Sequence, residues 1–164
     1  MKTEVRRTLG VAVACMALLL LTVSASGENK PEVLIARGDS YARKGDYDKA
    51  IADYTEALRL EPKNAAVHAK RAWSYARKDD YDKAFADCAE AIRLEPKLVL
   101  AYSNRGLCYA KKGDYDKAFA DHAEAILLDP KDAWLYSIRA EAHRALGHDV
   151  EAASDARITE KLKK

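Results

Sequence analysis

Apolar residues recur along most of the chain with a helical period. In the segments 65–78 and 82–94, alanines and large apolar side chains return at intervals of three and four residues. This spacing places them on one face of a helix, whereas a half-buried strand would alternate at every second residue. Gly45, Gly113 and Gly147 fall where a first helix must stop, in a left-handed conformation that glycine adopts without steric cost. The pattern predicts pairs of helices joined by tight turns.

The helix pairs repeat with a period of 34 residues. Three segments align without a gap, and they read GDYDKAIADYTEALRLEPK from Gly45, DDYDKAFADCAEAIRLEPK from Asp79 and GDYDKAFADHAEAILLDPK from Gly113. A degraded fourth copy begins at Gly147, and a proline closes each of the first three copies and blocks continuation of the helix. The chain therefore divides into four units, which span residues 31–64, 65–98, 99–132 and 133–164.

The repeating positions resemble those of tetratricopeptide repeats (TPRs). They are Gly38/Tyr41, Ala72/Tyr75, Gly106/Tyr109 and Ala140 in the first helices, and Ala50, Ala84, Ala118, Ala152, Ala57, Ala91 and Ala125 in the second. The resemblance implies an all-α fold, a right-handed α-solenoid of four helix–turn–helix repeats over residues 27–164. It also implies a non-enzymatic protein–protein interaction module that binds a peptide or protein segment in its concave groove.

An arginine stands in each unit where the family usually has leucine, and an aspartate follows sixteen residues later. Because an arginine binds a carboxylate with two parallel hydrogen bonds, we predict structural ion pairs within or between units. The alternative is a basic ladder that faces a ligand. The residues concerned are Arg37, Asp53, Arg71, Asp87, Arg105, Asp121, Arg139 and Asp155.

Residues of the first helices that do not repeat are the candidates for recognition, because packing does not dictate them. We predict a ligand-binding groove that contains Trp73, Lys70, Asn104, Leu107, Trp134 and Ile138. Clustered exposed tryptophan is typical of binding hot spots, and the alternative is partial burial against neighbouring first helices. Some relatives hold chaperone C-terminal carboxylates with a clamp of Lys, Asn and Arg. Only Asn104 has a counterpart in that clamp, so we do not expect it here.

Residues 1–26 have the order of a secretory signal peptide: a basic start, an apolar run from Leu9 to Val23 and then small residues. We expect cleavage and export to the periplasm or outside the cell. The alternative is an uncleaved anchor, which would be the protein's one link to the membrane. The net charge of +2 comes from this leader, since 25 basic and 25 acidic residues follow it. A neutral body does not favour nucleic-acid binding.

The sequence contains no catalytic or metal-binding motif, so we expect neither an enzyme nor a cofactor or metal. Its partner is expected to be a protein or peptide, with a self-associating structural subunit of an envelope complex as the alternative function. Cys88 and Cys108 lie on helices that are neighbours in this architecture. In an oxidising compartment they would form a disulfide across the unit interface, and the alternative is two buried free thiols.

Overall fold

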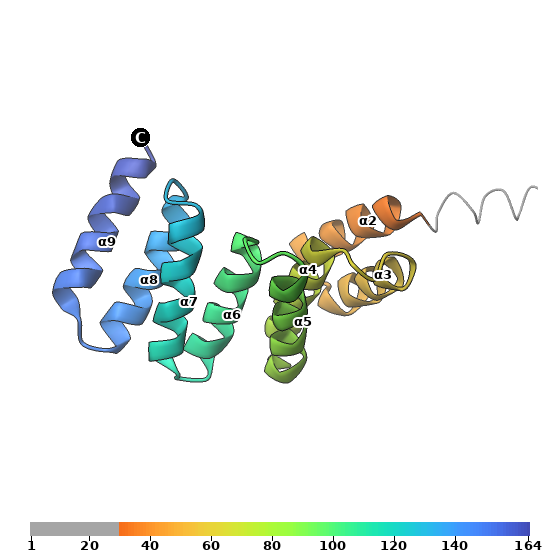
Figure 1. Ribbon diagram of the computed structural model, residues 1–164, viewed down its shortest axis with the longest axis horizontal. Helices are drawn as coiled ribbons and strands as arrows, with labels where there is room; N and C mark the ends of the chain where they lie inside the picture. Colours follow the sequence, from red (N-terminus) through yellow and green to blue (C-terminus); the bar gives the residue numbers. More distant parts are fainter. Residues whose placement is uncertain (1–29) are drawn as a thin grey trace, which may run out of the picture.

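The computed structural model describes residues 30–164, which form eight α-helices and the turns between them. The helices are α2 (Pro31–Arg43), α3 (Tyr47–Leu60), α4 (Ala65–Ala76), α5 (Tyr81–Leu94), α6 (Val99–Lys111), α7 (Tyr115–Leu128), α8 (Ala133–Ala145) and α9 (Asp149–Leu162). They stack in chain order from α2 and α3 at one end to α8 and α9 at the other (Figure 1). The predicted all-α architecture of four helix–turn–helix repeats is confirmed. The predicted signal peptide lies outside the described residues.

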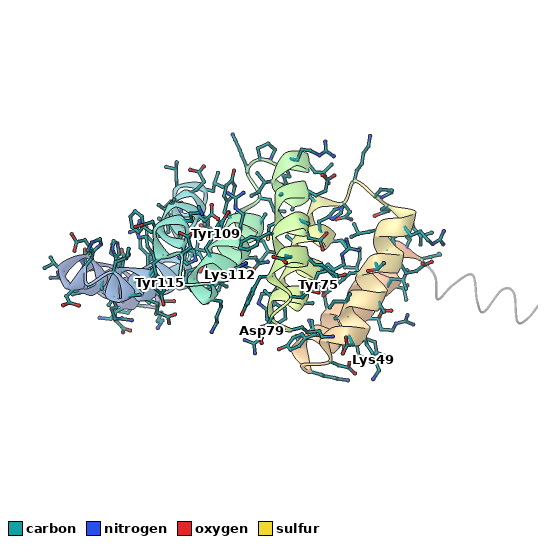
Figure 2. All side chains as sticks on the ribbon, turned by 90° about the horizontal axis from the view of Figure 1, so that it is seen from below. Lys49, Tyr75, Asp79, Tyr109, Lys112 and Tyr115 are labelled. Atoms are coloured by element: carbon teal, nitrogen blue, oxygen red, sulfur yellow. The ribbon has the colours of Figure 1, made fainter. Side chains whose placement is uncertain are left out.

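The turn inside each repeat depends on one residue with a left-handed backbone. Gly45 and Gly113 have φ of 80° and Gly147 has φ of 76°, whereas Asp79 in the second repeat has φ of 60°. Aspartate tolerates this region better than most residues, and its carboxylate accepts a hydrogen bond of 2.6 Å from the Tyr81 hydroxyl. Figure 2 labels Asp79 at the turn of the second repeat and Lys112 beside the turn of the third.

Small residues at the helix crossings form much of the core. The repeated alanines of the second helices are almost completely buried, and they are Ala50, Ala57, Ala84, Ala91, Ala118, Ala125 and Ala152. Alanine lets two helices approach closely, so each helix packs against the next along the chain. First helices also contact one another, most extensively α4 with α6. In the fourth repeat Thr159 takes the alanine position and bonds back to the Asp155 carbonyl oxygen at 2.9 Å.

Each repeat contains an arginine–aspartate ion pair between its two helices. The arginine Nε and Nη2 atoms donate to the two carboxylate oxygens over 2.6–2.8 Å. The four aspartates are buried. The pairs lie within repeats, and they are Arg37–Asp53, Arg71–Asp87, Arg105–Asp121 and Arg139–Asp155. Each arginine thus donates two hydrogen bonds to the aspartate of its own repeat, which supports the structural interpretation over a basic ladder that faces a ligand.

A second contact between the two helices of a repeat involves side chains of complementary size. A small residue on the first helix corresponds to a residue of varying size sixteen positions later on the second. Gly38 faces Tyr54, and a Cβ added to this glycine would lie 2.7 Å from the tyrosine ring. Gly106 faces His122 in the same way. In the second and fourth repeats the first partner is alanine and the second is small, giving Ala72 with Cys88 and Ala140 with Ala156. A large second-helix side chain is therefore accommodated by the loss of a methyl group on the first helix.

We predict that Gly106→Ala destabilises the protein. The new Cβ would lie 2.5 Å from the His122 ring and 3.2 Å from the Ala118 carbonyl oxygen. Such overpacking lowers the free energy of unfolding by about 1–3 kcal/mol, which exceeds the gain of roughly 1 kcal/mol in helix propensity. The double variant Gly106→Ala/His122→Cys copies the Ala72–Cys88 pair and should recover most of the loss. Urea denaturation of the wild type, the two single variants Gly106→Ala and His122→Cys, and the double variant measures the coupling, and strictly additive effects would contradict it.

Candidate functional site

A pocket of about 280 Å³ opens on the face formed by the first helices. Helices α2, α4, α6 and α8 all contribute to it, so it extends over all four repeats. Its lining consists of Asp39, Ala42, Arg43, Tyr54, Lys70, Trp73, Leu100, Asn104 and Trp134. The pocket combines apolar walls with a small set of charged and polar groups, as ligand sites commonly do.

Two tryptophans from different repeats form the pocket's aromatic walls. Trp134 on α8 is one of the exposed large hydrophobic residues and keeps 44% of its surface exposed. Trp73 on α4 is held in place by Tyr47, whose ring meets it edge-on at 5.5 Å. The Arg77 guanidinium lies 5.7 Å from the Trp73 ring centroid. Trp73 is therefore preorganised, while Trp134 is the more accessible wall.

An Asp39-centred network joins three helices at the bottom of the pocket. The Asp39 carboxylate accepts hydrogen bonds from the Tyr54 hydroxyl on α3 at 2.7 Å and from Lys70 Nζ on α4 at 2.6 Å. Burial, together with the hydrogen bond to Asp39, raises the pKa of Tyr54 well above its usual range. Tyr54 therefore remains a neutral donor, and the negative charge of Asp39 is already matched by Lys70.

Asn104 fixes α6 against α4 beside the pocket. It is 1% exposed, and its Nδ2 donates a 2.9 Å hydrogen bond to the Ala69 carbonyl oxygen. Its Oδ1 has no hydrogen-bond partner among residues 30–164. Arg43, in contrast, is exposed at the rim and takes part in none of the ion pairs within the described residues.

The structure brings together four of the six residues predicted for the groove: Lys70, Trp73, Asn104 and Trp134. Leu107 and Ile138 do not join them. Ile138 is only 5% exposed and belongs to a hydrophobic cluster against which Leu107 also packs. Ile138 is therefore buried and not accessible as expected, whereas Leu107 is partly buried. Ile138 occupies the repeat position of Asn104, and this position packs against the preceding first helix in both repeats.

Sequence reasoning did not place Tyr54 or Ala42 at the site. Tyr54 belongs to a second helix, and it reaches the pocket because Gly38 leaves space for its ring. The available signal was the variation at this repeat position, which holds Tyr, Cys, His and Ala in the four units. Of the four residues at this position, only Tyr54 lines the pocket, whereas Cys88 and His122 are buried in the core.

Comparison with family models identifies the repeats. The model described as "TPR repeat" matches residues 38–79, and models described as "Tetratricopeptide repeat" match residues 65–98 and 99–132. This chain is a tetratricopeptide repeat protein. A search of curated proteins gave no match. TPR domains are protein–protein interaction modules, so the pocket lies on a fold built for binding.

Solved structures of other TPR proteins are similar to this chain. MamA has 22% identity and a TM-score of 0.73, with 87% of this chain and 83% of MamA covered, which shows a common fold. The first TPR domain of Spaghetti (RPAP3), "bound to HSP90 peptide SRMEEVD", has 28% identity and a TM-score of 0.67, covering 73% and 95%. The Arabidopsis OM64 TPR domain has 27% identity and a TM-score of 0.65, covering 70% and 94%.

The two cysteines of this TPR domain are buried free thiols, so the structure does not contain the disulfide considered between them. Cys88 packs at the position that Tyr54 and His122 occupy in other repeats. Burial raises the pKa of Cys108 to about 11, and it raises the pKa of Cys88 further. Both side chains therefore act as small apolar groups, as free cysteines commonly do in protein interiors.

The described side chains form no cluster of three or more histidines, cysteines or carboxylates close enough to hold a metal ion. Within residues 30–164, no helix combines the length and apolar character required to cross a membrane.

His68 links two repeats through two hydrogen-bond acceptors. Its Nδ1 lies 3.0 Å from an Asp87 carboxylate oxygen, and its Nε2 lies 3.1 Å from the Pro62 carbonyl oxygen. The Asp87 contact raises the pKa of His68. Burial alone would raise the pKa of Asp87, but hydrogen bonds from Arg71 and His68 outweigh it and keep that pKa below its usual value. Tyr102 and Tyr136 make the equivalent bond to a proline carbonyl oxygen in the later repeats.

His122, unlike His68, lies in an environment without hydrogen-bond partners among the described residues. It is buried, and neither ring nitrogen has a hydrogen-bond partner in the described part of the chain. Burial lowers its pKa to about 4, although the nearby Asp121 carboxylate acts in the other direction. The neutral imidazole therefore packs as an apolar group, and its protonation opposes folding.

We predict two separate pH effects on stability. The raised pKa of His68 means that its stabilising contribution is complete below about pH 6.5, the unfolded value, and is lost as the pH rises through the folded value. The lowered pKa of His122 means that stability falls as the pH drops from about 6.5 towards 4. Urea denaturation between pH 4 and 9 measures both effects.

Two substitutions separate these effects. His68→Tyr keeps the bond to Pro62, as Tyr102 does with Pro96, and should remove only the loss above pH 6.5. His122→Cys should remove only the loss at acid pH. A His68→Tyr variant whose stability follows the wild-type curve above pH 6.5 would show that the Asp87 contact does not control this titration.

Proposed function

We propose that this TPR protein binds a peptide or a segment of another protein in the pocket formed by its first helices. The observation that carries the proposal is the pair of tryptophans, Trp73 and Trp134, which two different repeats bring to one pocket. Partly exposed tryptophan beside a preformed pocket is the commonest composition of an interface hot spot. The RPAP3 domain bound to an HSP90 peptide supports the proposal, because it has the same fold and 28% identity.

The pocket's charged groups fit binding better than catalysis. Lys70 and Tyr54 each donate a short hydrogen bond to one Asp39 carboxylate oxygen, so the charge of Asp39 is matched within the protein and stabilises the pocket wall. TPR folds are typically non-catalytic as well. We therefore propose an adaptor or scaffold that acts by holding its partner.

We also propose that the protein is exported to the periplasm or secreted, and that residues 1–26 direct this export. The basic start, the apolar run and the small residues that follow support the proposal. Mass spectrometry of the protein recovered from its native host tests it. A mature amino terminus near residue 26 is expected, whereas a full-length chain in the membrane fraction would indicate an anchor.

We predict that Trp134→Ala abolishes capture of the partner while leaving the fold intact. Trp134 is 44% exposed, so its loss removes a pocket wall without opening the core. Leu127→Ala is the matched control, because Leu127 is a large apolar residue that is 74% exposed on α7 and does not line the pocket. Truncating a hot-spot tryptophan weakens binding by 2 kcal/mol or more, roughly thirtyfold.

The measurement is affinity capture from extracts of the host's exported fraction, followed by titration with the captured partner. A partner that both variants retain would place the contact outside the pocket and refute the proposal. Light scattering over a range of protein concentrations tests the alternative of self-association. A mass that rises with concentration in wild type and in both variants would favour a structural subunit.

A further inference from the structure

The pocket has the size of a site for one large side chain. Its volume of about 280 Å³ is just below the range of small-molecule pockets, roughly 300–1,000 Å³. Trp73, Trp134 and Leu100 provide apolar surface on three different helices. An aromatic or large aliphatic side chain inserted here would lose its contact with water on several sides, which makes it an effective anchor.

The charge around this apolar centre is unbalanced. Asp39 is matched by Lys70 inside the pocket, so this pair contributes no net charge. Arg43 lines the rim, and none of the ion pairs within residues 30–164 includes it. Arg77 lies against Trp73, and its hydrogen bond goes to the neutral hydroxyl of Tyr47 at 3.1 Å. Two guanidinium groups beside the pocket thus have no carboxylate partner among the described residues.

We infer that the pocket recognises an internal peptide segment in which a large apolar side chain stands next to an acidic residue. This inference rests on the proposed function and specifies its ligand. The apolar side chain enters between Trp73 and Trp134, and the neighbouring carboxylate pairs with Arg43 or Arg77. A guanidinium suits this role because it forms two parallel hydrogen bonds with a carboxylate.

The same geometry argues against a free chain terminus as the anchor. Capture of a terminal carboxylate requires several donors that converge on one point. Here Lys70 already pairs with Asp39, and Asn104 Nδ2 already donates to the Ala69 carbonyl oxygen, so these donors do not converge on a second carboxylate. The unmatched cations lie at the rim instead, where a side chain one residue away from the anchor can reach them.

Four fluorescein-labelled heptapeptides, acetylated and amidated at their ends, test the inference. The first carries a central phenylalanine between two glutamates in a serine–glycine background. The second replaces the phenylalanine with alanine, the third replaces the glutamates with lysines and the fourth replaces them with glutamines. Fluorescence anisotropy with the full chain measures each affinity. We expect the first peptide to bind at least tenfold more tightly than the second and third, with the fourth between them.

Variants of the protein then assign the two contacts. Trp134→Ala should weaken the first peptide at least tenfold, and Leu127→Ala should leave it unchanged. The double variant Arg43→Gln/Arg77→Gln should weaken the glutamate peptide severalfold and leave the glutamine peptide unaffected. Arg157→Gln on α9, which does not line the pocket, controls for the general loss of positive charge. Circular dichroism and thermal unfolding check that each variant retains its fold.

Several results would overturn the inference. Equal affinity for the glutamate and lysine peptides would show that the arginines do not recognise an acidic residue. Equal affinity for the phenylalanine and alanine peptides would show that the pocket does not hold a large apolar side chain. An array of random-sequence peptides separates this failure from failure of the proposed function. If the four designed probes fail but array peptides bind wild type and not Trp134→Ala, the pocket binds peptides of another chemistry. If the array also fails, peptide binding in the pocket is itself refuted.

Discussion

The pair of an arginine with a buried aspartate is the constraint on which the rest of the structure depends. Each aspartate lies on a second helix with almost no contact with water, so it requires a cation at a fixed point on the first helix. The two-pronged geometry then sets both the rotation and the height of one helix relative to the other. In the second repeat, Arg71 Nη1 also donates to Thr55 of the preceding repeat at 3.0 Å, so the same residue helps to align neighbouring repeats.

Alignment of the repeats is what creates the pocket. First helices of neighbouring repeats contact one another, and their residues at nonrepeating positions therefore meet on one face. The repeating positions provide the stability, through alanines and ion pairs that recur in every unit. The nonrepeating positions provide the chemistry, and Trp73 and Trp134 are the clearest examples. Stability and recognition are thereby assigned to different residues of the same helices.

The fold could be predicted from the sequence because the period repeats the same packing information in every unit. The arginine–aspartate ion pairs could be predicted for the same reason, because the two residues recur at a constant spacing in every unit. The site was predicted only in part, because its residues occur once each. Ile138 shares a repeat position with Asn104, and both side chains are almost completely buried, yet only Asn104 lines the pocket. No repetition indicated which of the two would do so. Tyr54 reaches the pocket from a second helix only because Gly38 lacks a side chain.

The matching of Gly38 to Tyr54 and of Gly106 to His122 has a consequence for how such a chain diversifies. A first helix taken from the second repeat would bring the Ala72 methyl group against the ring of Tyr54 or His122. Exchange of whole repeats preserves each matched pair, whereas exchange of single helices breaks it. Recombination is therefore tolerated at the boundaries between repeats and opposed at the turn inside a repeat. The unit that can be duplicated or exchanged in this protein is therefore the whole helix pair, because its two helices carry facing side chains of complementary size.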